Sequence, residues 1–395
     1  MKKTALFFAC LLAGPILAQR PTADLKKLDG STITPKQIDG IAEKLIVYGK
    51  VDGLCISVIN GNKAYIKPYG FKDKEKDQLL DPETAFEAGS LSKAVFAYLS
   101  MKLVEEKILD LDKPLFEYLG DISQYPNWSP LAEDESWKLI TPRMCLSHTS
   151  GLPYSRFTNP QTGAEDQTAA LKLYYKPETK YVYSNEGFKL LQLTVEKITG
   201  KNLEELAIEK VFKPLEMFHS GFVWHSDFDE NYAMGYDEKG KPMAKKKTST
   251  PNAANSMVTT VADYTRFIQK ILLHQGLHPK VRNEMIAPQI AINSKYQFPS
   301  DHPETTEDNK DIQLSYALGW GFFKSKFGRA FFIESHDGAW RHYNVNFPDK
   351  NTAIIIMTNS TNAEQIFKEL LEKIIGDYET PWQWQGYIPF NYIKK

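Results

Sequence analysis

The tetrapeptide Ser90-Leu91-Ser92-Lys93 constrains this chain more than any other feature, because it joins a serine and a lysine at the start of an apolar segment. The segment continues through Leu99 without Gly or Pro, and its apolar residues recur at helical spacing. On a helix, positions i and i+3 lie on one face, so the Ser90 hydroxyl and the Lys93 amine would be neighbours. Ser90 would also lie at the helix N-terminus, where free N–H groups favour negative charge. Together these groups could form an acyl-transfer centre.

The same tetrapeptide also has a purely structural interpretation. A serine at a helix start is most often an N-cap, and a lysine in the first turn usually lies in solvent. Taken alone, the S-x-x-K pattern is a weak signal. The choice between the two interpretations depends on motifs further along the chain.

Composition argues against several classes of function. Hydrophobic residues make up 42% of the 395 residues, enough for the core of one large domain or of two. With 48 basic and 49 acidic residues the formal charge is −1, so nothing favours nucleic acid or an anionic membrane as partner. The run Lys245-Lys246-Lys247 is more typical of a solvated loop than of a binding patch. The expected partner is a small-molecule or peptide substrate.

The first residues predict export. A basic start at Lys2-Lys3 and an apolar stretch over residues 5–17 precede Ala18, which predicts a signal peptide over residues 1–18. No later segment approaches the roughly 20 apolar residues of a membrane helix, so no integral membrane segment is expected after cleavage. The expected location is periplasmic or secreted. Export would permit a disulfide between Cys55 and Cys145, but two buried free thiols are the preferred interpretation.

Periodicity predicts an α+β fold. Residues 35–48 form an amphipathic helix pattern, and strand patterns at 54–59 and 63–69 meet at Asn60-Gly61, a strong hairpin signal. The middle of the chain is mostly helical in pattern, strand patterns return between residues 316 and 358, and a helix pattern covers 362–375. We therefore expect an antiparallel sheet built from both termini and flanked by N- and C-terminal helices. Residues 36–90 and 258–376 would form this α/β part, and 91–257 an inserted, mainly helical part.

Two further motifs carry chemistry. Tyr183-Ser184-Asn185 precedes a predicted helix, and although Asn is a natural N-cap, a phenol can relay a proton and a carboxamide can hold an amide substrate. His336-Asp337-Gly338 follows a predicted strand, and its glycine would let a substrate approach the backbone. The next N–H, on Ala339, could point together with that of Ser90 at a developing oxyanion.

In this order, Ser90-x-x-Lys93, Tyr183-x-Asn185 and His336-x-Gly338 resemble the serine β-lactamase and penicillin-recognising hydrolase superfamily. The chain looks most like the subset with class C β-lactamases, D-alanyl-D-alanine carboxypeptidases, D-aminopeptidases and related esterases. The resemblance covers roughly residues 36–376 and implies an α/β sandwich with a helical domain. Agreement among three motifs makes the structural interpretation of Ser90 much weaker.

The resemblance implies a role for each motif residue. Ser90 would be the acylated nucleophile, Lys93 would keep the serine and tyrosine in working protonation states, and Tyr183 would act as general base and then acid. Whether lysine or tyrosine takes the first proton stays open, since a lysine base needs a depressed pKa. The resemblance implies no cofactor and no metal.

The substrate-binding roles follow in the same way. Asn185 would hold a substrate amide and Lys93, and His336 would line a strand edge and orient substrate or Tyr183. Gly338 would allow close approach, and the backbone N–H groups of Ser90 and Ala339 would form the oxyanion hole. His148, in a segment shared with the family, is expected to serve packing and hydrogen bonding.

The third motif departs from the family's antibiotic-destroying members, which typically carry Lys-Thr-Gly. A lysine is a permanent cation for a substrate carboxylate, whereas histidine is only partly charged near neutral pH. We therefore expect an amide or ester substrate, such as a D-amino-acid peptide, and weak turnover of β-lactams. The alternative is a non-catalytic penicillin-recognising sensor that keeps Ser90 but deacylates very slowly.

Overall fold

The computed structural model describes residues 24–391, so the signal peptide expected over residues 1–18 lies outside the described residues. Within them, no helix is long and apolar enough to cross a bilayer.

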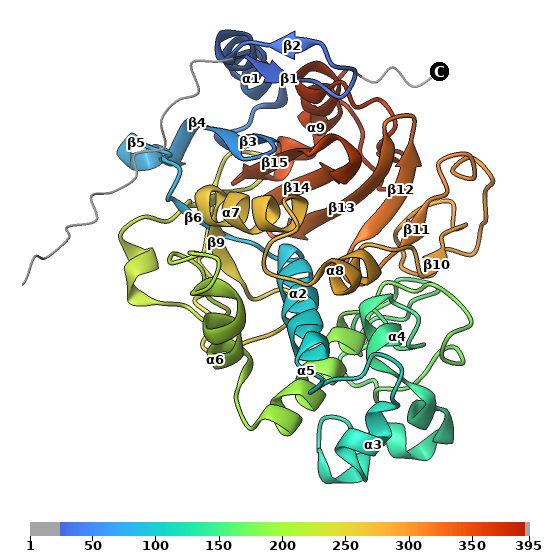
Figure 1. Cartoon of the computed structure of the whole chain (residues 1–395). Helices are drawn as coiled ribbons and strands as arrows, with labels where there is room; N and C mark the ends of the chain where they lie inside the picture. Colours follow the sequence, from blue (N-terminus) through green and yellow to red (C-terminus); the bar gives the residue numbers. More distant parts are fainter. Residues whose placement is uncertain (1–23, 392–395) are drawn as a thin grey trace, which may run out of the picture.

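An antiparallel nine-stranded sheet forms the centre of the molecule (Figure 1). In spatial order its strands are β10 (Ile290–Ala291), β11 (Ser315–Tyr316), β12 (Gly321–Ser325), β13 (Gly328–Asp337), β14 (Trp340–Phe347), β15 (Thr352–Thr358), β3 (Gly53–Asn60), β4 (Lys63–Asp73) and β5 (Gln78–Leu79). The two ends of the chain meet at the pairing of β15 with β3, where Ile356 lies opposite Ile56. The expected sheet from both termini is therefore confirmed.

Helices cover both faces of this sheet (Figure 1). On one face α1 (Pro35–Gly49) contacts α9 (Glu364–Leu370), and both pack on strand residues such as Ile56 and Ile356. On the other face α7 (Val261–Leu272) packs on β3 and β15. Because both faces are covered, the central strands are apolar at almost every position rather than alternating.

The α-helices between residues 106 and 257 are mostly short, although α5 (Asn185–Thr199) has 15 residues. They are α3 (Leu115–Leu119), α4 (Pro142–Leu146), α5 and α6 (Leu203–Ala207), and α8 (Pro279–Met285) follows α7. Residues 147–184 contain neither helix nor strand, so the middle is less helical than expected. The reason is local, because Gly151, Pro153, Pro160, Gly163 and Pro177 interrupt any regular pattern. The division at residues 91 and 257 stays a prediction.

Short paired strands complete the structure. The pairs are β1 (Leu25–Lys26) with β2 (Thr32–Ile33), β6 (Ala85–Glu87) with β9 (Val258–Thr260), and β7 (Gly235–Tyr236) with β8 (Pro242–Met243). The pair of β6 and β9 matters most, because β6 leads directly into α2 (Leu91–Glu105).

Helix α2 runs through the core between the sheet and the helical part of the molecule (Figure 1). It is buried on nearly every side, which explains why its apolar residues do not form a single stripe. Its N-terminus, at Ser90, therefore lies at the junction of the sheet and the helical part.

The strand patterns expected between residues 316 and 358 include one over residues 316–323, which the structure divides into β11 and β12. Gly319 interrupts it with a φ of 82°, a conformation that favours glycine. A side chain at Gly319 would collide with Ala97 and lie 3.2 Å from the carbonyl oxygen of Lys93, so the turn presses directly on α2.

We predict that Gly319→Ala destabilises the fold more than Gly200→Ala does. Gly200 also has a positive φ, 69°, but nothing lies within 4 Å of an added Cβ. Left-handed strain costs about 1 kcal/mol at either site, and overpacking against α2 adds about 1–3 kcal/mol at Gly319 only. Denaturant unfolding measures both free energies, and equal losses would contradict the contact with α2.

Candidate active site

Ser90 occupies the N-cap position of α2 but does not act as a cap. Its side chain makes no capping hydrogen bond, and its backbone is already helical, with φ −65° and ψ −13°. Gly89, immediately before it, has a positive φ of 50° that turns the chain from β6 into the helix. The structural interpretation of Ser90 is therefore wrong, since its hydroxyl is directed to other partners.

Those partners are Lys93 and Tyr183. The Lys93 Nζ and the Tyr183 hydroxyl each donate a hydrogen bond to the Ser90 Oγ at 3.1 Å. Lys93 also donates to the carbonyl oxygen of Ala254 at 2.8 Å. The structure thus brings Tyr183 to the helix that carries Ser90 and Lys93, and the carbonyl oxygen of Ala254 holds the lysine amine.

Burial sets the protonation of Lys93. Its side chain is fully buried, and among residues 24–391 it has no carboxylate within ion-pair distance. Burial lowers the pKa of Lys93 well below its usual value, and the nearby Lys189 cation lowers it further against the opposing charge of Asp337. The amine is therefore suited to accept a proton.

Burial has the opposite effect on Tyr183. It raises the pKa of the phenol, and the hydrogen bond to Ser90 only partly offsets this rise. Tyr183 is therefore a protonated phenol in this structure. The pKa directions favour Lys93, rather than Tyr183, as the group that takes the first proton.

His148 supports Tyr183 from behind. It is fully buried, its Nδ1 accepts the Ser184 N–H at 3.0 Å, and its ring centroid lies 4.2 Å from that of Tyr183. Burial lowers the pKa of His148 well below its usual value, so the ring is neutral. The expected packing and hydrogen-bonding role of His148 is confirmed.

Asn185 is the first residue of α5, and its side chain is buried beside the site. The Asn185 side chain contacts the Tyr154 hydroxyl. Its Oδ1, however, has no hydrogen-bond partner among the described residues. The expected contact with Lys93 does not form, because the Lys93 amine bonds Ser90 and Ala254 instead. A buried carbonyl without a donor is costly, so this atom is suited to receive a substrate N–H.

The side chain of His336 lies on the face of β13 that points away from Ser90. Its ring stacks on Tyr387 with centroids 5.6 Å apart, its Nδ1 lies 3.1 Å from Glu364, and its Nε2 lies 3.6 Å from Glu334. Burial opposes the charged ring, but the two carboxylates together raise the pKa of His336. None of the contacts found among the described residues joins it to Ser90 or Tyr183. No direct contact among these residues therefore supports the expected orientation of Tyr183 by His336.

Ser335 and Asp337, the neighbours of His336, face the nucleophile instead. The Ser90 N–H donates to the Ser335 Oγ at 2.9 Å, and a Cβ on Gly89 would lie 2.8 Å from the Cβ of Asp337. Successive strand side chains point to opposite faces, and this period of two is the signal by which Ser335 could have been found.

Lys246 is a second residue that the motifs did not reveal. It forms an ion pair with Asp337, and its Nζ lies 3.6 Å from Glu87, a buried carboxylate on β6. Lys247 instead pairs with Asp229 at 2.7 Å. Residues 245–247 lie in a loop in which Lys246 and Lys247 are exposed, as expected, and the exposed Lys246 nevertheless reaches Asp337 beside the site.

Gly338 and Ala339 form the two-residue loop between β13 and β14. Asp337 pairs with Trp340 across this loop, and Gly338 has a φ of 57° at its first position, where type II′ hairpins require glycine. Ala339 is fully buried, and its Cβ would lie 2.9 Å from a Cβ on Gly235. Its oxyanion role stays a prediction.

A polar cleft of about 400 Å³ adjoins the site through Asp337 and Asn252. Lys189 and Lys246 also line it, together with the aromatic ring of Trp128. Most residues that line this cleft carry hydrogen-bonding side chains, although apolar atoms also contribute much of its surface.

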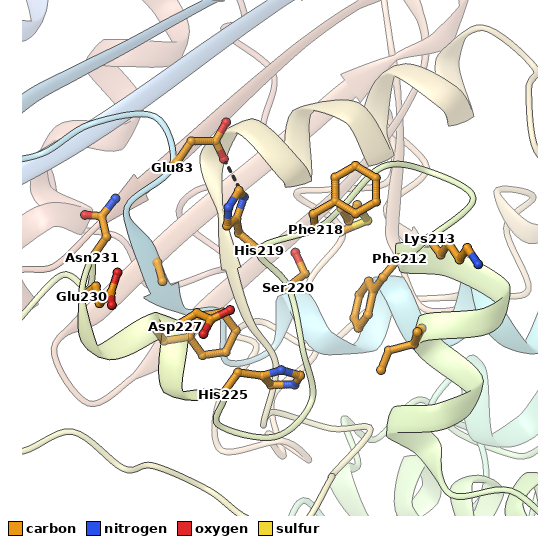
Figure 2. A pocket seen from close by; sticks show the side chains of 14 residues that line it. Glu83, Phe212, Lys213, Phe218, His219, Ser220, His225, Asp227, Glu230 and Asn231 are labelled. Carbon is orange, nitrogen blue, oxygen red and sulfur yellow. Dashed lines mark ion pairs between the residues drawn. The ribbon is translucent and has the colours of Figure 1, made fainter. Parts of the chain in front are cut away.

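A separate cavity of about 630 Å³ shares no lining residue with the cleft (Figure 2). Figure 2 shows the pair of Glu83 with His219 facing the rings of Phe212 and Phe218. The side-chain atoms of Glu83, His219 and Asp263 that could bind a metal ion lie within 4.8 Å of one another. Arg266 already supplies positive charge there, 2.5 Å from Asp263 and 3.5 Å from Glu83.

The two cysteines of the described chain do not pair. Cys55 and Cys145 are both free and buried, and burial raises the pKa of each thiol. The preferred interpretation of two buried free thiols is confirmed.

We predict that Lys93→Met removes a pH dependence of stability. In the wild type the unfolded chain keeps the lysine proton up to about pH 10.4, while the folded protein releases it earlier. The free energy of unfolding therefore rises with pH between the folded and unfolded pKa values, by up to about 1.4 kcal/mol per pH unit. Denaturant unfolding at several pH values should show this rise for the wild type relative to Lys93→Met. Parallel curves would contradict a neutral buried amine.

The comparisons with known proteins agree with this geometry. The model of the family described as Beta-lactamase matches residues 38–375. "Protein flp" of Staphylococcus aureus (strain MRSA252) is 27% identical over 248 residues, which cover 59% of this chain and 48% of that protein. The chain thus spans about half the length of this relative. The "Beta-lactamase" of Escherichia coli (strain K12) is 26% identical over 263 residues, covering 64% of this chain and 66% of that protein.

Solved structures share the fold. The octameric penicillin-binding protein homologue from Pyrococcus abyssi matches with a TM-score of 0.68 and 21% identity, over 83% of this chain and 74% of that one. The D-alanine carboxypeptidase AmpC from Burkholderia cenocepacia matches with a TM-score of 0.69 and 18% identity, over 86% of this chain and 98% of that one. The family match spans most of the chain, and the structures share its sheet and helices. The chain belongs to the Beta-lactamase family and has its serine hydrolase fold.

Proposed function

We propose that this protein is an exported serine hydrolase that cleaves amide or ester bonds through an acyl-enzyme on Ser90. The observation that carries the proposal is the Ser90 Oγ at 3.1 Å from both the Lys93 Nζ and the Tyr183 hydroxyl. A nucleophile within hydrogen-bond reach of a neutral amine and a phenol has what acyl transfer requires.

Acylation follows from the protonation states of the three groups. The neutral Lys93 amine takes the Ser90 proton as the Oγ bonds to the substrate carbonyl carbon. When the bond to the leaving group breaks, Tyr183 donates its proton to that group and regains one from Lys93. Water then attacks the carbonyl carbon of the acyl-enzyme, the bond from that carbon to the Ser90 Oγ breaks, a proton of the water passes to the Oγ, and the acyl group leaves as the acid. The depressed pKa of Lys93 and the raised pKa of Tyr183 support this order of transfers.

The substrate we propose is a D-amino-acid peptide, amide or ester. The unpartnered Asn185 Oδ1 would accept an N–H from the acyl side of such a substrate. A carboxylate shared by β-lactams would meet no lysine on β13, and Lys246, which reaches this strand from a loop, is already paired with Asp337. Weak turnover of β-lactams is expected for that reason. The similarity to the D-alanine carboxypeptidase from Burkholderia cenocepacia supports the fold and does not identify the substrate.

Export to the periplasm or medium is part of the proposal. It rests on the basic and apolar pattern of residues 1–18. Cell fractionation with mass measurement of the mature protein tests it, and a full-length protein in the cytoplasm would refute it.

We predict that Ser90→Ala lowers hydrolysis of every accepted substrate by at least about 10³-fold, because the acyl-enzyme cannot form. A panel of D-Ala-D-Ala peptides, D-amino-acid amides, short esters and a chromogenic cephalosporin measures this. Ser100→Ala is the matched control, since its hydroxyl lies on the same helix and donates to the carbonyl oxygen of Phe96.

Mass spectrometry over time separates the enzyme from the sensor alternative. Rapid return of unmodified protein after acylation supports turnover. A lasting adduct on Ser90 would favour a penicillin-recognising sensor. Full activity of Ser90→Ala on any substrate would refute the catalytic assignment for that substrate.

We predict that Tyr183→Phe slows amide hydrolysis about 10²- to 10⁴-fold, the usual contribution of a general acid. Esters with acidic leaving groups should lose much less, because their leaving groups depart without a proton. Steady-state rates on an amide and an activated ester with the same acyl group measure the contrast. Equal losses on both would contradict a role in protonating the leaving group.

A further inference from the structure

The Ser90 N–H, which an oxyanion hole would need, already has an acceptor in this structure. It donates at 2.9 Å to the Ser335 Oγ, a buried oxygen that reaches it from β13. A substrate carbonyl oxygen bound for acylation would need the same donor, because it must lie next to the nucleophile. Ser335 therefore places a protein oxygen where a substrate oxygen would bind.

The strand leaves little room between itself and the nucleophile. A side chain at Gly89 would collide with the Ser335 Oγ and lie 2.8 Å from the Asp337 Cβ. Ser335 and Asp337 point to the same face of β13, so both pack directly on the segment that leads into α2. The hydrogen bond between Ser90 and Ser335 is thus part of the close packing of these β13 side chains on the backbone at Gly89.

The end of β13 is held in this position by neighbouring residues. Asp337 is paired with Lys246, and Trp340 Nε1 donates to the carbonyl oxygen of Ala233 at 3.2 Å. His342, opposite Ser335 on β14, is fully buried and lies 2.8 Å from the carbonyl oxygen of Glu87. Rotation of one hydroxyl about χ1 disturbs none of these contacts, whereas a shift of the strand breaks them.

We propose that Ser335 is a positioning residue whose hydroxyl occupies the oxyanion position of the free enzyme and must rotate away before acylation. The inference rests on the proposed function and concerns the same site. Every substrate displaces the same hydrogen bond, so Ser335 lowers reactivity toward all acyl groups alike. A developing oxyanion is a stronger acceptor than a neutral hydroxyl, so it displaces the Ser335 oxygen from the Ser90 N–H during acylation.

Removing the hydroxyl tests this. Ser335→Ala should raise kcat/KM about fivefold on both amides and esters, the value of one hydrogen bond no longer displaced. It should tighten binding of a boronic acid, whose oxygen occupies the oxyanion position, by the same factor. Ser335→Cys keeps a side chain of similar size with a weak acceptor and should show a smaller gain. Ser100→Ala, a hydroxyl removed from α2 away from the site, should change neither quantity.

A second readout does not depend on turnover. Amide hydrogen exchange should show a protected Ser90 N–H in the wild type and faster exchange in Ser335→Ala. An unchanged or lower kcat/KM for Ser335→Ala, with thermal stability like the wild type, overturns the inference and leaves the proposed function intact. Failure of the proposed function looks different, because the wild type would then hydrolyse none of the panel and a fluorophosphonate would not label Ser90.

Discussion

The burial of the Lys93 amine is the interaction on which the site depends. A buried ammonium without a carboxylate partner is expensive, and the structure resolves this by favouring the neutral amine. The same burial that removes stability creates a base beside Ser90. Helix α2 can hold such a group because it runs through the core, with apolar residues on nearly every side. A helix on the surface would leave the lysine solvated and protonated.

The sheet positions the second half of the site. Strands from both ends of the chain meet at β3 and β15, and β13 and β14 extend from them toward the N-terminus of α2. The loop before α5 brings Tyr183 from the helical part, with His148 packed behind it. Lys93, Tyr183 and Ser335, which contact the Ser90 oxygen or its N–H, thus come from three different segments. The geometry around Ser90 forms only when all three segments are correctly packed.

Much of this fold could be predicted from sequence, and the exceptions have physical causes. The helix at residues 35–48 follows from its periodicity and from the capping of Thr34, which accepts the Gln37 N–H at 3.1 Å. The glycine at position 319 was a local signal for the break in the strand, but the close approach of α2 that excludes a side chain there could not be predicted from sequence. Lys246 could not be separated from its two lysine neighbours either, since only the path of the loop directs it toward Asp337.

Motifs and periodicity are local properties, so sequence patterns sufficed to indicate which residues are available for chemistry, their order, and the antiparallel sheet from both termini. Which side chain of residues 335–337 faces the nucleophile depends instead on how the strands pack. A strand alternates faces at every residue, so a motif names the strand but not the face that it presents. Tertiary structure also decided the protonation of Lys93 and Tyr183, because the pKa depends on what surrounds a group and not on its neighbours in sequence.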